Sequence, residues 1–187
     1  MSQTTVSSSG QTIGLPGQVA DSMDTNDIVS GFNSEASNQL PWGYGLMRGP
    51  AGQNSFVLPS GASGTMEVSG LNVFSAAHQR AGNADPNGNF SGDMGASGLL
   101  PKASLQVGIR GRFIVPVENT VQPGDRAFCR VVATGALTNG IWSGTNMGGS
   151  YVRDCTQQGI FRSSTYTAYD GTTKVAVLEW DAVNKPA

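Results

Sequence analysis

Charged residues are scarce in this chain of 187 residues. Lysine and arginine number 11 and aspartate and glutamate 13, so the charged fraction is 13%, about half of the roughly 25% typical of soluble domains. The net charge is −2 and the basic residues are scattered along the chain. A nucleic-acid-binding protein would show clustered basic residues and a basic balance, so we predict no nucleic acid partner. So few charges also indicate a surface that is partly covered in an assembly.

Histidine and cysteine are scarcer still. His78 is the single histidine, and a Ser-His-Asp or Cys-His arrangement would have to use it, although no catalytic motif surrounds it. One histidine and two widely spaced cysteines, Cys129 and Cys155, are too few ligands for a structural zinc site. We therefore predict no enzyme activity, no metal and no cofactor. The spacing does not decide whether the cysteines pair, and free thiols are expected in a reducing compartment.

Long apolar runs are absent as well. No stretch approaches the roughly 20 apolar residues that a transmembrane helix needs. Residues 2–12 have neither the basic start nor the apolar run of a secretory signal peptide. We therefore predict no membrane partner and expect the protein to be made in a cytosol-like, reducing compartment.

Glycine, by contrast, is plentiful at 26 residues, and serine, threonine and asparagine fill much of the remainder. These residues are weak in helix interiors but common in turns and short strands. Apolar and polar residues alternate along residues 105–117, which predicts a half-buried strand, and Gly111 interrupts its apolar face where a bend is expected. The sequence QPGD at residues 122–125 predicts a type II turn, and a strand is expected at 126–133.

Further short strands are expected in the last third of the chain. Short apolar segments lie near residues 151–152, 159–161 and 165–169, and the Asp-Gly pair at 170–171 predicts a hairpin turn into the nearly all-apolar residues 174–180. Such a series of short strands predicts an all-β fold, as a small β-barrel or a jelly-roll-like sandwich.

The chain is predicted to consist of an extended, flexible N-terminal arm, residues 1–20, and a single β domain, residues 21–187. The arm begins with a dozen polar residues and continues into the Gly/Pro-punctuated IGLPGQ. Long glycine-rich loops are expected at 78–98 and 135–149. Within the first loop, NADPNG matches half of a calcium-binding loop, but Met94 replaces the bidentate glutamate, so an ordinary turn is preferred.

The three tryptophans are candidate binding residues. Trp180 lies in an apolar run and is expected in the core, whereas Trp42 follows a proline in an extended segment and Trp142 stands in a glycine-rich loop where exposure is expected. Exposed tryptophans could anchor a protein interface or stack on sugars. A carbohydrate-binding β-sandwich module is therefore an alternative function, and a hydrolase on a β scaffold is a weaker one.

Several segments together resemble the capsid cement proteins of tailed bacteriophages. They are GLPGQVADS (residues 14–22), GRFIVPVE (111–118), VQPGD (121–125) and GIF (159–161). The order and spacing of these segments agree with the family from about residue 13 to residue 183, and this order carries the resemblance.

The resemblance implies a small β-barrel or jelly-roll-like protein that decorates the outer surface of the expanded phage head. It implies that the protein bridges major capsid proteins, assembles with itself as a dimer or trimer, and is made in the bacterial cytoplasm. We expect the capsid and self contacts to come from the arm, the Trp42 segment and the glycine-rich loops. The candidate interface residues are Ile13, Leu15, Pro16, Gln18, Val19, Trp42, Tyr44, Leu46, Met47 and Trp142.

Overall fold

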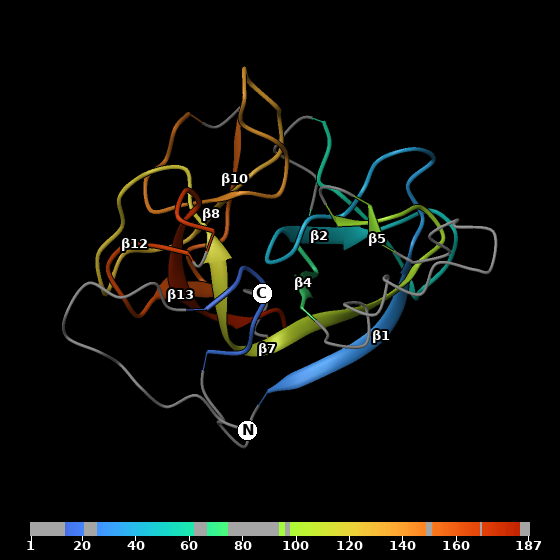
Figure 1. The fold of residues 1–187 in the computed structure, drawn as a ribbon, viewed down its shortest axis with the longest axis horizontal. Helices are drawn as coiled ribbons and strands as arrows, with labels where there is room; N and C mark the ends of the chain where they lie inside the picture. The colour runs from blue at the N-terminus through green and yellow to red at the C-terminus, as the bar shows by residue number, and fades with distance from the viewer. Residues whose placement is uncertain are drawn as a thin grey trace.

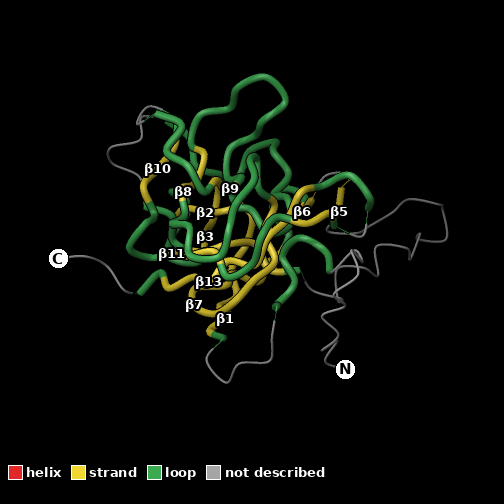
Figure 2. The backbone as a smooth tube through the Cα atoms, turned by 90° about the vertical axis from the view of Figure 1, so that its left-hand side faces the viewer, coloured by secondary structure: helices red, strands yellow, loops and turns green. Residues whose placement is uncertain are grey.

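The computed structural model describes residues 14–20, 26–61, 67–74, 94–95, 98–148, 151–168 and 170–183 (Figure 1). Across these residues the chain is all-β, with short strands joined by long loops (Figure 2). No helix among them is long and apolar enough to cross a membrane. The predicted fold class is therefore confirmed.

The strands follow one another along the chain in this order: β1 (Asp27–Asn33), β2 (Gly45–Arg48), β3 (Ser55–Val57), β4 (Gly70–Val73), β5 (Met94–Gly95), β6 (Gly98–Leu99), β7 (Ser104–Pro116), β8 (Phe128–Arg130), β9 (Trp142–Ser143), β10 (Val152–Asp154), β11 (Gly159–Phe161), β12 (Tyr166–Thr167) and β13 (Lys174–Asp181).

Five strands close into a barrel in the order β1-β3-β2-β4-β7, and β7 completes the circle by pairing with β1. The β1–β3 pair is parallel, and the other pairs of the barrel are antiparallel. Closure leaves no unpaired edge in the barrel, which protects the backbone from pairing with other chains. Beyond the barrel, β13 pairs with β7, and β11 and β12 pair with β13. A smaller sheet, in the order β10-β8-β9, lies above them in Figure 1.

Strand β7 connects the two parts of the fold. Its first half pairs with β1 and β4, and its second half pairs with β13. The change of partner falls at Gly111, whose φ of +135° is rarely adopted by residues with a side chain and where an added Cβ would collide with Asn26. The predicted strand and the predicted bend are therefore both confirmed.

Two apolar clusters form the main core. One fills the barrel with Leu40, Leu46, Phe56, Leu99, Ala103, Leu105 and Val107. The other lies between β7, β13 and the small sheet and includes Phe113, Trp142, Phe161 and Trp180. Trp180 is 1% exposed, which confirms its predicted core position. Two buried asparagines tie loops to the barrel, since Asn33 Nδ2 donates to the Leu99 carbonyl at 3.0 Å and Asn72 Nδ2 to the Leu40 carbonyl at 2.8 Å.

The turns predicted in the second half of the chain are present. The Asp125 amide donates to the Gln122 carbonyl at 3.1 Å and Gly124 has a φ of +96°, as a type II turn requires. Gly171, with a φ of +74°, lies in the turn between β12 and β13. The strand expected at 126–133 is shorter, because β8 pairs along only three residues with β10. His78 and the calcium-like segment 83–88 lie outside the described residues.

Candidate functional site

Two of the candidate interface residues are fully buried. Leu46 and Trp142 are both 0% exposed, so the prediction that Trp142 stands exposed in a loop is wrong. Trp142 begins β9, its Nε1 donates to the Gly43 carbonyl at 2.8 Å, and its ring lies 5.2 Å from that of Trp180. Gly45 makes room for it, since an added Cβ there would lie 3.2 Å from the indole ring.

This burial bears on the sugar-binding alternative. With Trp142 and Trp180 in the core, two of the three tryptophan platforms on which that alternative depended are inaccessible. Trp42 is half-buried and packs edge-on against Phe74, with ring centroids 5.4 Å apart. A planar row of exposed aromatic rings is therefore not formed by the tryptophans.

Residues 14–20, at the end of the predicted arm, lie against the protein's own β domain. The Gly17 amide donates to the Ile114 carbonyl at 2.7 Å, its carbonyl accepts from the Phe74 amide at 2.8 Å, and the Ala20 amide donates to the Arg112 carbonyl at 2.8 Å. The segment thus adds an extended stretch beside the second half of β7. Its backbone hydrogen bonds fix the position of residues 14–20 on the domain.

The candidates on this segment differ in exposure. Val19 is 38% exposed, whereas Leu15, Pro16 and Gln18 are half-buried. Ile13 lies outside the described residues.

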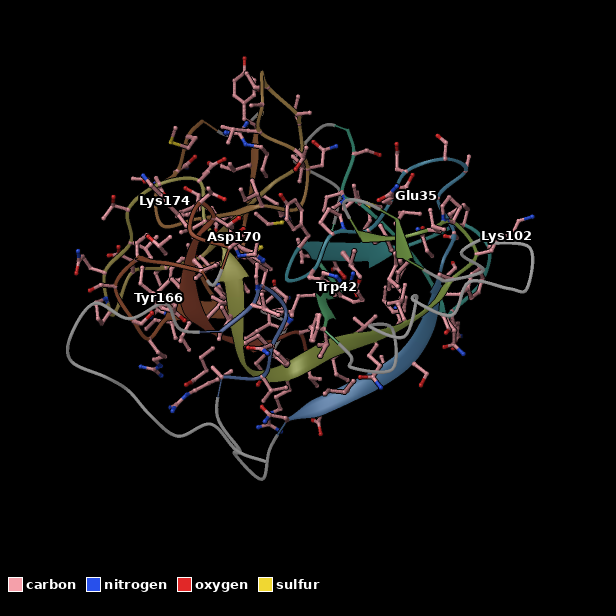
Figure 3. The ribbon with its side chains drawn as sticks, viewed as in Figure 1. Glu35, Trp42, Lys102, Tyr166, Asp170 and Lys174 are labelled. Carbon is pink, nitrogen blue, oxygen red and sulfur yellow. The ribbon has the colours of Figure 1, made fainter. Side chains whose placement is uncertain are left out.

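The arm candidates and the Trp42 segment are neighbours in space. An added Cβ at Gly43 would lie 2.8 Å from the Gly17 nitrogen. Trp42 packs against the ring of Phe74, and the Phe74 amide donates to the Gly17 carbonyl. Figure 3 shows Trp42 near the middle of the molecule. Tyr44 and Met47, which follow Trp42 in the same segment, are also half-buried. The structure therefore brings two separate stretches of candidates together, while their role in binding stays a prediction.

The sequence patterns did not single out two exposed apolar residues, Met147 and Tyr151. Met147 is 50% exposed and Tyr151 is 45% exposed, at the turn between β9 and β10. The turn is held by backbone bonds, with the Tyr151 amide donating to the Gly148 carbonyl at 2.9 Å and the Val131 amide donating to the Tyr151 carbonyl at 2.8 Å. We call Met147 and Tyr151 the apolar tip. The available signal was two large apolar residues that flank a short glycine-serine stretch.

Both cysteines are free and buried, in agreement with the default interpretation of the sequence. Burial raises the pKa of the Cys155 thiol to about 12 and raises the pKa of Cys129 well above its usual value. Protonated thiols are poor nucleophiles. These two residues therefore act as small core side chains.

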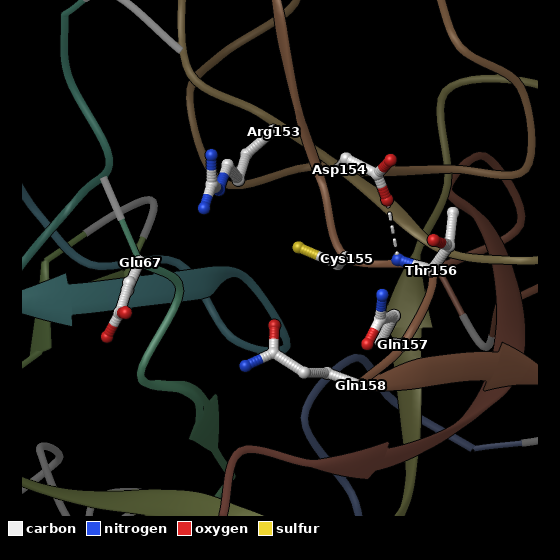
Figure 4. Close-up of a pocket in the computed structure, with 7 residues that line it drawn as sticks. All are labelled: Glu67, Arg153, Asp154, Cys155, Thr156, Gln157 and Gln158. Carbon is white, nitrogen blue, oxygen red and sulfur yellow. Dashed lines mark hydrogen bonds between the residues drawn. The ribbon is translucent and has the colours of Figure 1, made fainter. Parts of the chain in front are cut away.

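A pocket of ≈ 330 Å³ lies beside Cys155 (Figure 4) and is lined by Glu67, Arg153, Asp154, Cys155, Thr156, Gln157 and Gln158. The Asp154 carboxylate accepts from the Thr156 amide at 2.8 Å, so it caps the local turn. With the thiol protonated, the pocket does not offer the nucleophile that acyl transfer would need. No group of three or more potential metal ligands occurs among the residues that the structure describes.

Glu179 lies between two arginines on the outer face of the sheet. Arg162 donates to both of its carboxylate oxygens at 3.0 and 2.9 Å, and Arg112 Nε donates at 2.8 Å. These hydrogen bonds, with that from Arg162 the largest cause, lower the pKa of Glu179 from 4.5 to about 2.

We expect Glu179→Gln to lose a pH-dependent part of the protein's stability. Because the folded-state pKa is depressed, the stabilisation is present above pH 4.5 and is lost as the pH falls towards 2. At neutral pH the variant should be less stable by at most about 1 kcal/mol, since water screens a pair that is a third exposed. Urea unfolding from pH 7 to pH 2 measures this, and a gap between variant and wild type that does not narrow with acid would contradict it.

The chain is similar in sequence and in fold to known phage proteins. Residues 2–178 match the family described as "Structural cement protein (E217 gp24/Pam3 gp6)". No curated protein matches the chain. A solved structure titled "The capsid of Myoviridae Phage XM1" aligns with a TM-score of 0.61 and 13% identity over 94% of this chain and 95% of that chain, which shows a common fold. The chain therefore belongs to the family of phage structural cement proteins.

Proposed function

We propose that this cement protein binds the outer surface of the expanded phage head and stabilises the head by bridging neighbouring major capsid proteins. The proposal starts from the family, which makes the chain a structural protein of the phage capsid. The observation that carries it further is the apolar tip, because two large apolar side chains are held in the solvent at one turn.

The apolar tip has the composition of an interface anchor. Tyrosine and methionine are enriched where proteins meet, and a few such residues contribute most of the binding energy. The Tyr151 carbonyl accepts from the amide of Val131, the residue after β8, so the backbone of this anchor is held in place before it binds. Ordering in the free protein reduces the entropy that binding would otherwise cost.

The arm supplies the second contact in this proposal. Residues 14–20 are anchored on β7, so the residues that precede them begin at a fixed place and can extend along a partner with main-chain hydrogen bonds. Leu15, Pro16, Gln18 and Val19, with Trp42 beside them, form the edge of this contact. We propose that the buried Leu46 and Trp142 support it from the core rather than touch the partner.

Two or more contacts on one protein suit a cement. If the apolar tip and the arm bind different capsid subunits, each contact can be weak while the shell gains from their combination over many equivalent sites. Closed symmetry would also allow copies of the protein to pair as a dimer or trimer on the head.

The test is co-sedimentation with empty, expanded phage heads stripped of their decoration. Wild-type protein should pellet saturably at a fixed ratio to the major capsid protein. The double variant Met147→Ser with Tyr151→Ser should bind at least about thirtyfold more weakly, because a single anchor of this type contributes about 2 kcal/mol or more. Val183→Ser, at a position 69% exposed, is the matched control and should bind like wild type.

A truncation separates the arm from the tip. Deleting residues 2–12 spares the anchored residues 14–20 and should weaken binding to heads while leaving the urea unfolding midpoint unchanged. Wild-type affinity in both the truncation and the tip variant would refute the proposed contacts, and no binding of wild type to cognate heads would refute the proposed function.

A further inference from the structure

We propose that the outer face of β7, β13 and β11 is a second docking surface, which binds an acidic segment of the protein shell through arginine–carboxylate contacts. This inference rests on the proposed function and adds the chemistry of one partner. We call the surface the arginine face. Its charged residues are Arg110, Arg112, Arg126, Arg162, Glu179 and Asp181, together with Asp27 of β1, which lies opposite Arg110.

The strand registers place these side chains on one face. Arg112 lies opposite Glu179, which lies opposite Ile160, and Ile160 forms a bridge with Arg126. Residues directly opposite each other in antiparallel strands point to the same side of the sheet. These four residues therefore form one row across the face.

The two-residue period of the strands places the remaining charged side chains on the same face. Arg110 is paired with Asp181, and each lies two positions from a member of the first row. Arg162 lies two positions beyond Ile160, immediately after β11. Residues two apart along a strand share a face. The chain's scattered basic residues thus gather here, since four of its eight arginines lie on this single surface.

The arginine face has the opposite charge sign to the protein. Four guanidinium groups against three carboxylates, with Asp27 counted, give it a net charge of +1, whereas the chain carries −2. The arginine side chains remain accessible, with exposed fractions of 52% for Arg110, 33% for Arg112 and 44% for Arg162. The charge and exposure together favour an anionic partner.

The face is hollowed and its donors are held in position. A pocket of ≈ 350 Å³ lies between Arg126, Arg162, Glu179 and Gln158. Arg162 uses two N–H groups on Glu179, and Arg126 uses one on the Thr156 carbonyl at 3.1 Å. A guanidinium carries five N–H donors, so both keep donors for a ligand. Their planar forks match the geometry of a carboxylate.

An acidic protein segment suits this face better than DNA or a second copy. Nucleic acid affinity comes from many neutralised phosphates, and a face of net charge +1 offers few. A two-fold contact with a second copy would place this positive face against itself. A peptide segment that carries carboxylates has the opposite charge to the face and can accept from the free donors of Arg126 and Arg162.

The test is a charge reversal that spares the ion pairs around Glu179. Arg110 lies 3.7 Å from Asp181 and Arg126 donates to the Thr156 carbonyl, so the double variant Arg110→Glu with Arg126→Glu removes few contacts and should fold. Its affinity for stripped heads should fall at least about tenfold, and the salt dependence of binding should become flatter. Equal urea midpoints confirm that the variant is folded.

Lys102→Glu with Lys174→Glu is the matched control, because it changes the net charge equally at two lysines on opposite sides of the view in Figure 3. It should bind heads like wild type. Wild-type binding by the arginine variant, or an equal loss in the control, would overturn the inference. So would salt-sensitive binding of a short DNA duplex, or a dimer that dissociates in the arginine variant. If wild type itself does not bind heads, the proposed function fails first.

Discussion

Glu118→Ala is expected to lower the free energy of unfolding by about 3–5 kcal/mol, because it leaves a buried arginine without its counter-charge. Arg130 Nε lies 2.6 Å from the Glu118 carboxylate, and the two side chains are only 4% and 2% exposed. Arg130 also donates to the Val132 carbonyl at 3.1 Å, which does not neutralise it. Urea or guanidinium unfolding at neutral pH measures the loss.

The double variant Glu118→Leu with Arg130→Met is the control for this result. It removes both charges and keeps apolar volume, so it should recover most of the stability that the single variant loses. A loss of less than about 1 kcal/mol in Glu118→Ala would mean that water reaches Arg130. The ion pair also links two segments of the fold. Glu118 lies just after β7, and Arg130 is the last residue of β8, next to Val131, which bonds the apolar tip.

Trp142→Ala is expected to destabilise the protein by a similar amount, about 3–5 kcal/mol, since it opens a large cavity in the core. The indole is fully buried and packs on Trp180, and its removal also leaves the Gly43 carbonyl without a donor. Denaturant unfolding followed by near-ultraviolet circular dichroism reports both the stability and the loss of the tryptophan pair.

Trp42→Ala serves as the matched comparison. Trp42 packs against Phe74 and the barrel cluster but is only half-buried, so the cost of removing its side chain should be clearly smaller than that of Trp142→Ala. An equal loss of unfolding free energy in the two variants would contradict the difference in burial between Trp142 and Trp42. The comparison also tests the correction to the sequence-based prediction, which placed Trp142 at the surface.

Local patterns in the sequence were sufficient for much of the fold. The alternation along residues 105–117 became β7, the QPGD turn and the Asp-Gly hairpin are present, and the apolar residues 174–180 lie within β13. These features depend on period, turn chemistry and glycine conformation, which a few neighbouring residues determine.

Local patterns failed where a residue's environment comes from distant segments. Trp142 stands in a glycine-rich stretch, which predicted exposure, yet the barrel and Trp180 cover it. Residues 14–20 are a second example. Their Gly/Pro pattern predicted an extended arm, but it did not reveal that Gly17 forms backbone hydrogen bonds with Ile114 and Phe74. Burial is a property of what packs on a segment, and composition does not contain it.

By itself, the sequence determined the fold class, the main strands and turns, and a resemblance to the family that the match over residues 2–178 confirms. Only the tertiary structure decided that five strands close into a barrel, that Met147 and Tyr151 project at one turn, and that Arg126 and Arg162 join Arg110 on one face. The reason is strand register: pairing over long separations sets which residues are neighbours, and a shift of one residue would send each side chain to the opposite face.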